Sequence, residues 1–310
     1  MMIKFIKYCA TFVLPFLIAA VPLEWMLRQV PNPYKYKYEW MQKNASDVEI
    51  LIFGSSHTFF GVRPQFIKGK AFSLANVSQS HKEDYYLLKY WADRYRHLRT
   101  VIVPISYFTW FSQGLESGNE SFRCRYYKLY MDCDLYPDSP FYNLELSHFG
   151  SAKGKVDKLF SEDTDPGCDD YGWGNAYKLS LKDTVSWSSG TEAEAAVERH
   201  KAKDWNSIGT NYERMKEMAE FCKEHGIQLV LITTPCWHSY YDKLARVQLQ
   251  RMYELTRKFQ KDSGVLYLDY MRDTRFVADD FFDSNHLSDV GAEKFTKILD
   301  KDIKRHGRSQ

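Results

Sequence analysis

The stretch VEILIFGSSH, which runs from Val48 to His57, joins a short apolar run to a glycine, two serines and a histidine. A short apolar run that ends in glycine is typical of a strand buried on both faces, as the strands of parallel sheets are. Ligands of open parallel sheets collect at the carboxyl ends of the strands. We therefore expect Gly54, Ser55 and Ser56 to lie at the functional edge of such a sheet.

Further apolar runs follow along the chain, and helical patterns separate most of them. The later strands are expected at AFSLA (71–75), TVIVPI (100–105), IQLVLITTP (227–235) and VLYLDY (265–270). Helices are expected at about 82–96, from about 212 to Gly226, from about 249 to Gly264 and around 290–299. Because parallel neighbours require crossover connections, this alternation predicts a three-layer α/β/α, flavodoxin-like fold around a five-stranded parallel sheet.

Between about 107 and 205 the alternation stops. Glycine, proline, aspartate and serine dominate there, as in SEDTDPGCDDYGWGN (161–175). A stretch of this length is too long for an ordinary loop in a compact domain. We interpret it as a large irregular insertion, or cap, within one domain that spans residues 47–310.

The first residues carry the clearest signal for cellular location. Lys4 and Lys7 precede the apolar run YCATFVLPFLIAAVPL (8–23), and further apolar residues after Glu24 bring it to the length of a membrane-spanning helix. A cleaved signal peptide is the alternative, but no small-x-small cleavage site follows the run. We therefore expect residues 1–28 to form an uncleaved signal anchor and residues 29–46 a juxtamembrane linker. The rest of the chain is then periplasmic or extracellular.

Charge and cysteine content argue against two classes of function. The 42 basic and 40 acidic residues are scattered and leave a net charge of +2, so the sequence lacks the basic patch of a nucleic-acid-binding protein. No C-x-x-C pair or zinc-type Cys/His spacing occurs, so we expect no metal site. Six cysteines fit an oxidising compartment, in which a disulfide among Cys124, Cys133 and Cys168 would hold their loop-rich region.

A serine hydroxyl becomes an effective nucleophile when an imidazole takes its proton and a carboxylate orients that imidazole. After the fifth expected strand, the sequence DDFFDSNHLSDVGAEKF places Asp283 three residues before His286, so the carboxylate can fold back to the ring. Ser56 is the matching nucleophile, with Ser55 as the alternative if the turn is shifted by one residue. We expect His57 to pack or to line the pocket. This chemistry requires no cofactor.

These two blocks resemble the first and last blocks of the SGNH (GDSL-like) hydrolase superfamily, a G-D-S block and a D-x-x-H block. The resemblance covers about residues 49–295 apart from the insertion, and it implies catalytic roles for Ser56, Asp283 and His286. With its N-terminal apolar segment and large insertion, the chain looks most like the membrane-anchored branch. That branch includes the D-alanine transfer protein of teichoic acid modification and the alginate O-acetylation proteins, which work beside membrane-bound O-acyltransferases.

The sequence departs from that superfamily where the oxyanion hole is expected. The second block, SLANVSQS (73–80), has no glycine, and the third strand ends in PISYF (104–108) without an asparagine. The Ser56 N–H remains one donor, and the N–H of Ala75 or Asn76, or the Asn76 side chain, is the expected second donor. Three more polar residues follow strand ends and are candidates for oxyanion or substrate contacts: Gln79, Ser106 and Thr234.

These observations predict a membrane-anchored, extracytoplasmic serine esterase or O-acyltransferase. The resemblance implies that it acts on acyl esters of a cell-surface polysaccharide or similar polymer, beside a membrane-bound O-acyltransferase. The incomplete oxyanion blocks support an alternative, a catalytically weak glycan-binding or scaffold protein of a surface-polymer assembly complex. A general lipid or small-ester hydrolase is a third hypothesis.

Overall fold

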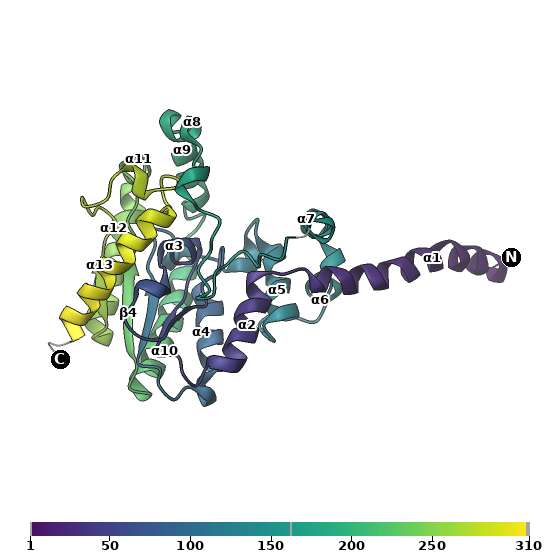
Figure 1. Ribbon diagram of the computed structural model, residues 1–310, viewed down its shortest axis with the longest axis horizontal. Coiled ribbons are helices and arrows are strands. Elements are labelled where there is room, and N and C mark those ends of the chain that lie inside the picture. Colours follow the sequence, from purple (N-terminus) through teal and green to yellow (C-terminus); the bar gives the residue numbers. More distant parts are fainter. Residues whose placement is uncertain (1, 162, 308–310) are drawn as a thin grey trace.

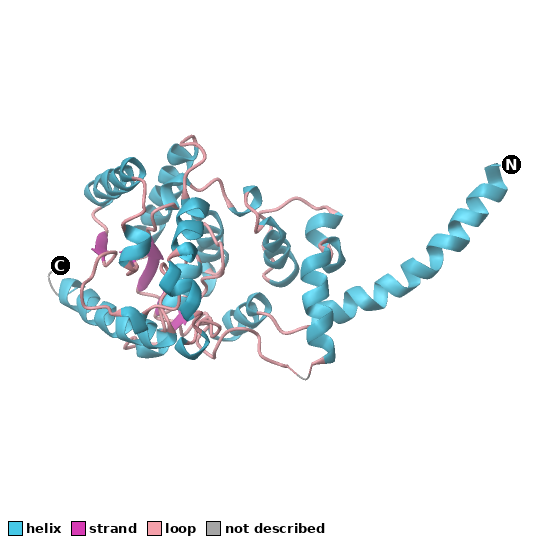
Figure 2. Ribbon diagram, turned by 90° about the horizontal axis from the view of Figure 1, so that it is seen from above, coloured by secondary structure: helices cyan, strands magenta, loops and turns pink. Residues whose placement is uncertain are grey.

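The computed structural model describes residues 2–161 and 163–307, and five parallel strands form its centre (Figures 1 and 2). The strands are β1 (Ile50–Ile52), β2 (Ala71–Ser73), β3 (Thr100–Pro104), β4 (Gln228–Thr233) and β5 (Leu266–Asp269). Their order in the sheet is β2-β1-β3-β4-β5, and every neighbouring pair is parallel. This order confirms the flavodoxin-like α/β/α fold with a five-stranded parallel sheet.

Helices cover both faces of the sheet. The longer ones in the sheet domain are α4 (His81–Tyr90), α10 (Ser207–Glu224), α12 (Arg246–Ser263) and α13 (Asp289–Gly307), with the short α3 (Ser56–Gly61) and α11 (His238–Tyr241) at strand ends. Alternate strand residues face opposite sides. Leu51 and Val101 pack with α4, α10 and α12, whereas Ile52 and Ile102 pack with α13. The apolar runs are therefore continuous because both of their faces are buried.

Local signals set the helix ends at the expected places. Ser80 forms a capping box with Glu83 at the start of α4. The helices α10 and α12 end before Gly226 and Gly264, which have φ values of 66° and 70°. Glycine adopts this left-handed conformation without steric cost, so these two positions end their helices as expected.

The insertion at about 107–205 is richer in helix than its composition suggests. It contains α5 (Cys124–Tyr130), α6 (Pro140–Asn143), α7 (Phe149–Phe160), α8 (Thr184–Ser189) and α9 (Thr191–His200), together with several 3-10 turns. The disulfide considered for this region does not form, because Cys124, Cys133 and Cys168 are all free thiols. Cys124 and Cys133 are buried in the main core, and Cys168 belongs to a separate small cluster around Phe59 and Phe60.

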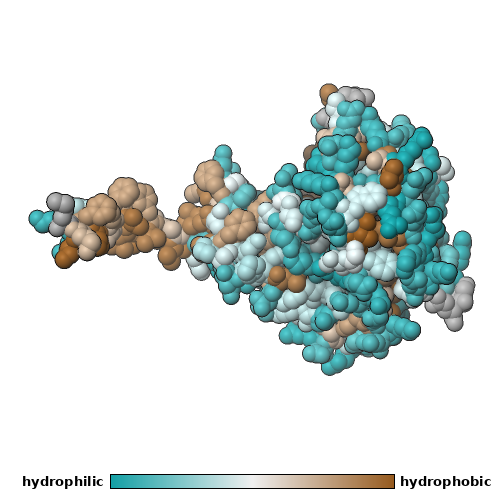
Figure 3. Space-filling model, turned by 180° about the vertical axis from the view of Figure 1, so that it is seen from behind, coloured by the Kyte–Doolittle hydropathy of each residue, from teal (hydrophilic) through white to brown (hydrophobic). Residues whose placement is uncertain are grey.

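The N-terminal helix α1 (Met2–Gln29) projects away from the rest of the molecule (Figures 1 and 2). It is long and apolar enough to cross a membrane, and apolar residues cover its surface in Figure 3. The segment expected as a linker, 29–46, contains α2 (Pro33–Asn44). Tyr34 and Met41 of α2 are buried in the main core, so this segment packs against the sheet domain.

Candidate active site

The turn between β1 and α3 carries the candidate nucleophile. Gly54 has a φ of 108°, and a Cβ at this position would overlap the ring of Pro104 and lie 2.8 Å from Thr58 Oγ1. Only glycine fits both conditions. The Gly54 N–H donates to Asp84 Oδ1 at 2.9 Å, and its carbonyl accepts from the Asn76 N–H at 3.0 Å. These contacts fix the turn from two sides, and Ser56 follows as the first residue of α3.

The structure brings Ser56, His286 and Asp283 together in the order that nucleophilic catalysis requires. Ser56 Oγ lies 2.8 Å from His286 Nε2. On the other side of the ring, His286 Nδ1 lies 2.9 and 2.8 Å from the two carboxylate oxygens of Asp283. An Nδ1–H that donates to Asp283 leaves Nε2 free to accept the serine proton.

The environment of Asp283 keeps it ionised. Burial raises the pKa of Asp283, but the charge and hydrogen bond of His286, together with the N–H groups of Asn285 and His286, hold it below its ordinary value. Those two N–H groups donate to Asp283 Oδ1 at 3.0 and 2.8 Å. The D-S-N-H segment therefore folds around its own carboxylate. Glu192 of the insertion also holds it, because Ser284 N and Oγ donate to Glu192 Oε1 at 2.9 and 2.7 Å.

A second layer of polar side chains lies behind Ser56, His286 and Asp283, which together form the candidate triad. The Asn285 amide donates to His57 Nε2 at 3.1 Å, and His57 Nδ1 lies 2.7 Å from Ser106 Oγ. Burial, and then the neighbouring rings of His286 and His200, lower the pKa of His57 well below its ordinary value. A neutral His57 that accepts at Nε2 must donate from Nδ1, so Ser106 Oγ is the acceptor. His57 thus packs beside the triad, as expected, and Ser106 contacts it.

Sequence reasoning missed residues that reach the site from the insertion. His200 forms an edge contact with His57 at 5.8 Å between centroids and hydrogen-bonds Tyr240 OH at 2.7 Å. Burial lowers the pKa of His200 to about 3. Tyr177 stacks between Phe60 and Phe282, and its edge contacts the His286 ring. These residues lie in the stretch without strand–helix alternation, so no sequence pattern pointed to them. Asn285, by contrast, lies within the D-S-N-H block that the sequence singled out.

The residues expected to contact the oxyanion or the substrate, Ala75, Asn76, Gln79 and Thr234, differ in what they contact in the structure. The Asn76 amide donates to Leu74 O and Gln79 Oε1, and Gln79 also contacts Asp84 and Tyr127. Both side chains are buried, so the structure uses them to hold the β2–α4 loop. Thr234 is buried near Gly61, at the far end of α3. The Ala75 N–H makes a long hydrogen bond of 3.4 Å to Ser73 Oγ.

Two buried ionisable groups support the loops on either side of Ser56. Lys37 of α2 donates to the Ala75 carbonyl and lies over the Phe59 ring, and burial lowers its pKa to about 7. Asp84 of α4 accepts from Gly54 N and Gln79 Nε2, and burial raises its pKa to about 8. No sequence motif identified either residue. Both hold main-chain or loop groups of the site, and neither contacts Ser56 Oγ.

Asp84→Asn is expected to change how stability depends on pH. The pKa of Asp84 is about 8 in the folded protein and 3.8 ordinarily, so the folded state keeps a proton that the unfolded state has lost. The stability contributed by Asp84 is therefore full below the ordinary pKa and is lost as the pH rises to about 8. The loss is about 1.4 kcal/mol per pH unit in that window. Asparagine does not titrate.

Urea unfolding across this pH range checks the prediction. The free energy of unfolding of the parent, minus that of Asp84→Asn, should fall as the pH rises towards 8 and then level off. Asp93→Asn, at an exposed position, is the matched control, and its difference from the parent should stay flat. A flat difference for Asp84→Asn as well would show that Asp84 is not buried as a neutral acid.

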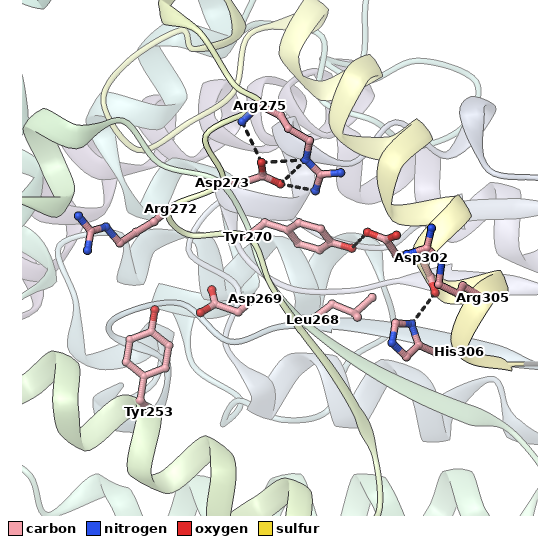
Figure 4. A pocket seen from close by; sticks show the side chains of 10 residues that line it. All are labelled: Tyr253, Leu268, Asp269, Tyr270, Arg272, Asp273, Arg275, Asp302, Arg305 and His306. Atoms are coloured by element: carbon pink, nitrogen blue, oxygen red, sulfur yellow. Dashed lines mark hydrogen bonds and ion pairs between the residues drawn. The ribbon is translucent and has the colours of Figure 1, made fainter. Parts of the chain in front are cut away.

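A cavity of about 480 Å³ lies away from the triad, between β5 and the end of α13 (Figure 4). Some of its lining side chains contact each other: Arg275 pairs with Asp273, and Tyr270 OH donates to Asp302 at 2.9 Å. None of the triad residues lines it. Among the residues that the structure describes, no group of His, Cys, Asp and Glu side chains is arranged to hold a metal ion.

The sequence matches no protein-family model and no curated protein. Solved structures show a distant likeness. A GDSL-like lipase from Bacteroides thetaiotaomicron is 10% identical, with a TM-score of 0.39, over 88% of this chain and 100% of that chain. A protein from Bacteroides fragilis, provisionally described as an acylhydrolase, is 10% identical, with a TM-score of 0.38, over 90% of this chain and 94% of that chain. A Streptococcus protein, provisionally described as a platelet activating factor, is 9% identical, with a TM-score of 0.41, over 95% of this chain and 98% of that chain. At identities and TM-scores this low, the chemistry of the site has to be argued from its own geometry.

Proposed function

We propose that this chain is a membrane-anchored serine esterase or O-acyltransferase that acts on acyl esters of a cell-surface polysaccharide. One observation carries the proposal: Ser56 Oγ lies 2.8 Å from His286 Nε2, while Asp283 holds the opposite nitrogen of the same ring. The scaffold alternative has no need of this arrangement. His286 is buried, whereas Ser56 and Asp283 on either side of it are partly exposed, so the hydroxyl is open to a substrate.

The reaction follows from these positions. Ser56 Oγ attacks the carbonyl carbon of the ester while its proton passes to His286 Nε2. Asp283 stabilises the resulting imidazolium. The bond to the leaving alcohol then breaks, and His286 gives that alcohol the proton. Water or a sugar hydroxyl attacks the acyl-enzyme in the second half, with His286 again as the base. Hydrolysis and acyl transfer differ only in this acceptor.

Two main-chain donors are available for the developing oxyanion. The first N–H groups of a helix have no carbonyl partner within that helix, so Ser56 N–H is free to donate. The Ala75 N–H is the second candidate, because its contact with Ser73 is long, whereas Asn76 N–H is bonded to Gly54 O. We assign Lys37 a positioning role here, since it holds the carbonyl of Ala75. Loss of one oxyanion donor typically costs about 10²–10³ in rate.

The location and partners of the enzyme rest on its N-terminus and its resemblance to membrane-anchored SGNH proteins. The helix α1 is the proposed single-pass anchor, with residues 29–310 outside the cytoplasm. In this setting a membrane-bound O-acyltransferase is the proposed partner, and an acylated surface polymer is the proposed substrate. In the stack of Phe60, Tyr177 and Phe282 beside His286, the partly exposed Phe282 at one end is the ring proposed to pack on a sugar of the substrate.

Labelling with a fluorophosphonate probe tests the proposed chemistry. The full-length chain in detergent should form a covalent adduct on Ser56, found by peptide mass spectrometry, and Ser56→Ala should not react. Ser55→Ala is the matched control, because Ser55 is the neighbouring hydroxyl and caps α3 without a side-chain hydrogen bond. It should label like the parent.

Two outcomes would overturn the proposal: an adduct that survives in Ser56→Ala, or no adduct under conditions that label a known serine hydrolase. A second measurement separates hydrolysis from transfer. The acyl-enzyme formed from an activated acetyl ester is chased with water alone or with a polysaccharide acceptor. Acetyl groups recovered on the polymer identify a transferase, and free acetate with both chases identifies a hydrolase.

A further inference from the structure

The helix α7 in the insertion exposes two large apolar side chains on one face. Phe149 and Phe160 are 82% and 85% exposed, and they lie eleven residues apart. Eleven residues are close to three turns of helix, so both rings project from the same side. Lys153 lies between them on that side and is also exposed. Exposed apolar side chains that gather on one face mark an interaction surface.

Another face of α7 is fixed to the body of the protein. Ala152 and Lys155 are buried there. Lys155 Nζ donates to Glu145 Oε1 at 2.7 Å and to Tyr130 OH at 2.9 Å. These contacts hold the helix in one rotational setting, which keeps Phe149 and Phe160 directed outward.

The same region also holds the end of α1. Glu24 accepts from the N–H groups of Glu145 and Leu146 at 2.9 and 3.0 Å. Arg28 pairs with Glu24 at 2.7 Å and donates to Asn143 O at 2.7 Å. The last turns of α1 are therefore attached to the segment that precedes α7, and α1 itself contacts α7. The anchor and α7 form one connected unit.

The orientation of α7 places its exposed face at a defined depth. In Figure 1 α7 is viewed nearly down its axis, next to the C-terminal end of α1. In Figure 2, which is turned by 90°, α7 is viewed from the side. The helix α1 extends away from the body in both views, so α7 runs across its root. The apolar part of α1 from Tyr8 to Leu23 is about 24 Å long, close to the thickness of a bilayer core, and Lys4 and Lys7 lie beyond its other end. A bilayer around that part ends next to Glu24, at the level of α7.

We propose that α7 is an interfacial helix that lies on the phospholipid bilayer containing α1, with Phe149 and Phe160 in the boundary between headgroups and acyl chains. This inference rests on the proposed anchoring. Apolar rings on one helix face, with a lysine between them that reaches headgroup phosphates, are typical of helices in the membrane interface. Phe141 and Leu144, in and next to α6, are exposed as well. Two attachments then fix the tilt of the catalytic domain, which one helix alone would leave free.

Quenching by brominated lipid tests this contact. The full-length chain is reconstituted into phosphatidylcholine vesicles with plain or brominated acyl chains, as the parent and as Phe149→Trp and Phe160→Trp. The matched control is Val247→Trp, because Val247 is also exposed and belongs to α12, a helix far from α1 (Figure 1). The fluorescence added by Phe149→Trp and Phe160→Trp should be mostly lost in brominated vesicles, and that added by Val247→Trp should be retained. The two phenylalanine positions read the contact independently if one variant fails to fold.

Flotation of the parent with the vesicles reads the anchoring separately. A chain that floats, with no quenching at either phenylalanine position, overturns the interfacial helix and leaves the anchor standing. That result would favour a protein partner on the same face. A chain that neither floats nor shows quenching overturns both proposals. Quenching at Val247→Trp as strong as at Phe149→Trp would also overturn the assignment, because the contact would not be specific to α7.

Discussion

His286→Ala is expected to lower kcat for ester hydrolysis by about 10⁴–10⁶, with little change in KM. The variant removes the ring nitrogen 2.8 Å from Ser56 Oγ, which is the proposed acceptor of the serine proton, and the bare hydroxyl is a poor nucleophile at neutral pH. Asp283 would then face a cavity where the ring had been. A remaining rate above that of water would come from the oxyanion donors and from substrate binding. Hydrolysis of p-nitrophenyl acetate by the full-length chain measures the change.

His57→Gln is the matched control for that experiment. His57 lies next to Ser56 in sequence and forms an edge contact with the His286 ring at 5.1 Å between centroids, so it is the other histidine that competes for the role of base. Its own bonds go to Ser106 and Asn285. Glutamine keeps an acceptor towards Asn285, so we expect kcat to change by less than about tenfold. Equal losses in the two variants would contradict the assignment of His286 as the base.

The fold was predictable because the strands β1 to β4 are buried on both faces. The strand β1 is apolar throughout and leads to the turn at Gly54, and the later helices α10 and α12 stop before Gly226 and Gly264. These are local signals, which a sequence carries openly. The helices of the insertion were not predicted. The helix α7 contains Gly150 and Gly154, and it is stabilised by the buried contacts of Lys155 with Glu145 and Tyr130, which no local pattern displays.

Some residues of the candidate site could likewise be predicted from local sequence blocks, and others could not. Ser56, Asp283 and His286 stand in short blocks at a strand end and before the last helix, so the sequence places them without further information. Asn76 and Gln79 also follow a strand end, and they looked like site residues for that reason. The Asn76 amide instead bonds Leu74 and Gln79. The Gln79 amide bonds Asp84 and Tyr127, and Tyr127 is distant in sequence. Tertiary packing of the insertion brings three more residues to the site, His200, Tyr177 and Glu192. Such packing has no characteristic spacing in the sequence, so these residues could not be predicted.

Gly54→Ala is expected to lower the free energy of unfolding by about 2–5 kcal/mol and to reduce esterase activity sharply. The left-handed backbone at this position, with a φ of 108°, costs a non-glycine residue about 1–2 kcal/mol. The new methyl group would also overlap Pro104, and such overpacking costs about 1–3 kcal/mol more. Because Pro104 belongs to the central strand β3, the turn has to move. Ser56, two residues on, would then shift away from His286.

Gly264→Ala separates the two causes, because Gly264 has a similar left-handed conformation, with a φ of 70°, and no atom within 4 Å of a new Cβ. It should cost about 1 kcal/mol and leave activity unchanged. The double variant Gly54→Ala with Pro104→Ala removes the ring atoms in question, so it should recover about 1–3 kcal/mol relative to additive losses. Urea unfolding compares the parent with Gly54→Ala, Pro104→Ala, the double variant and Gly264→Ala. If Gly54→Ala cost no more than Gly264→Ala, or if the double variant showed no recovery, close packing against Pro104 would not be what demands glycine before the nucleophile.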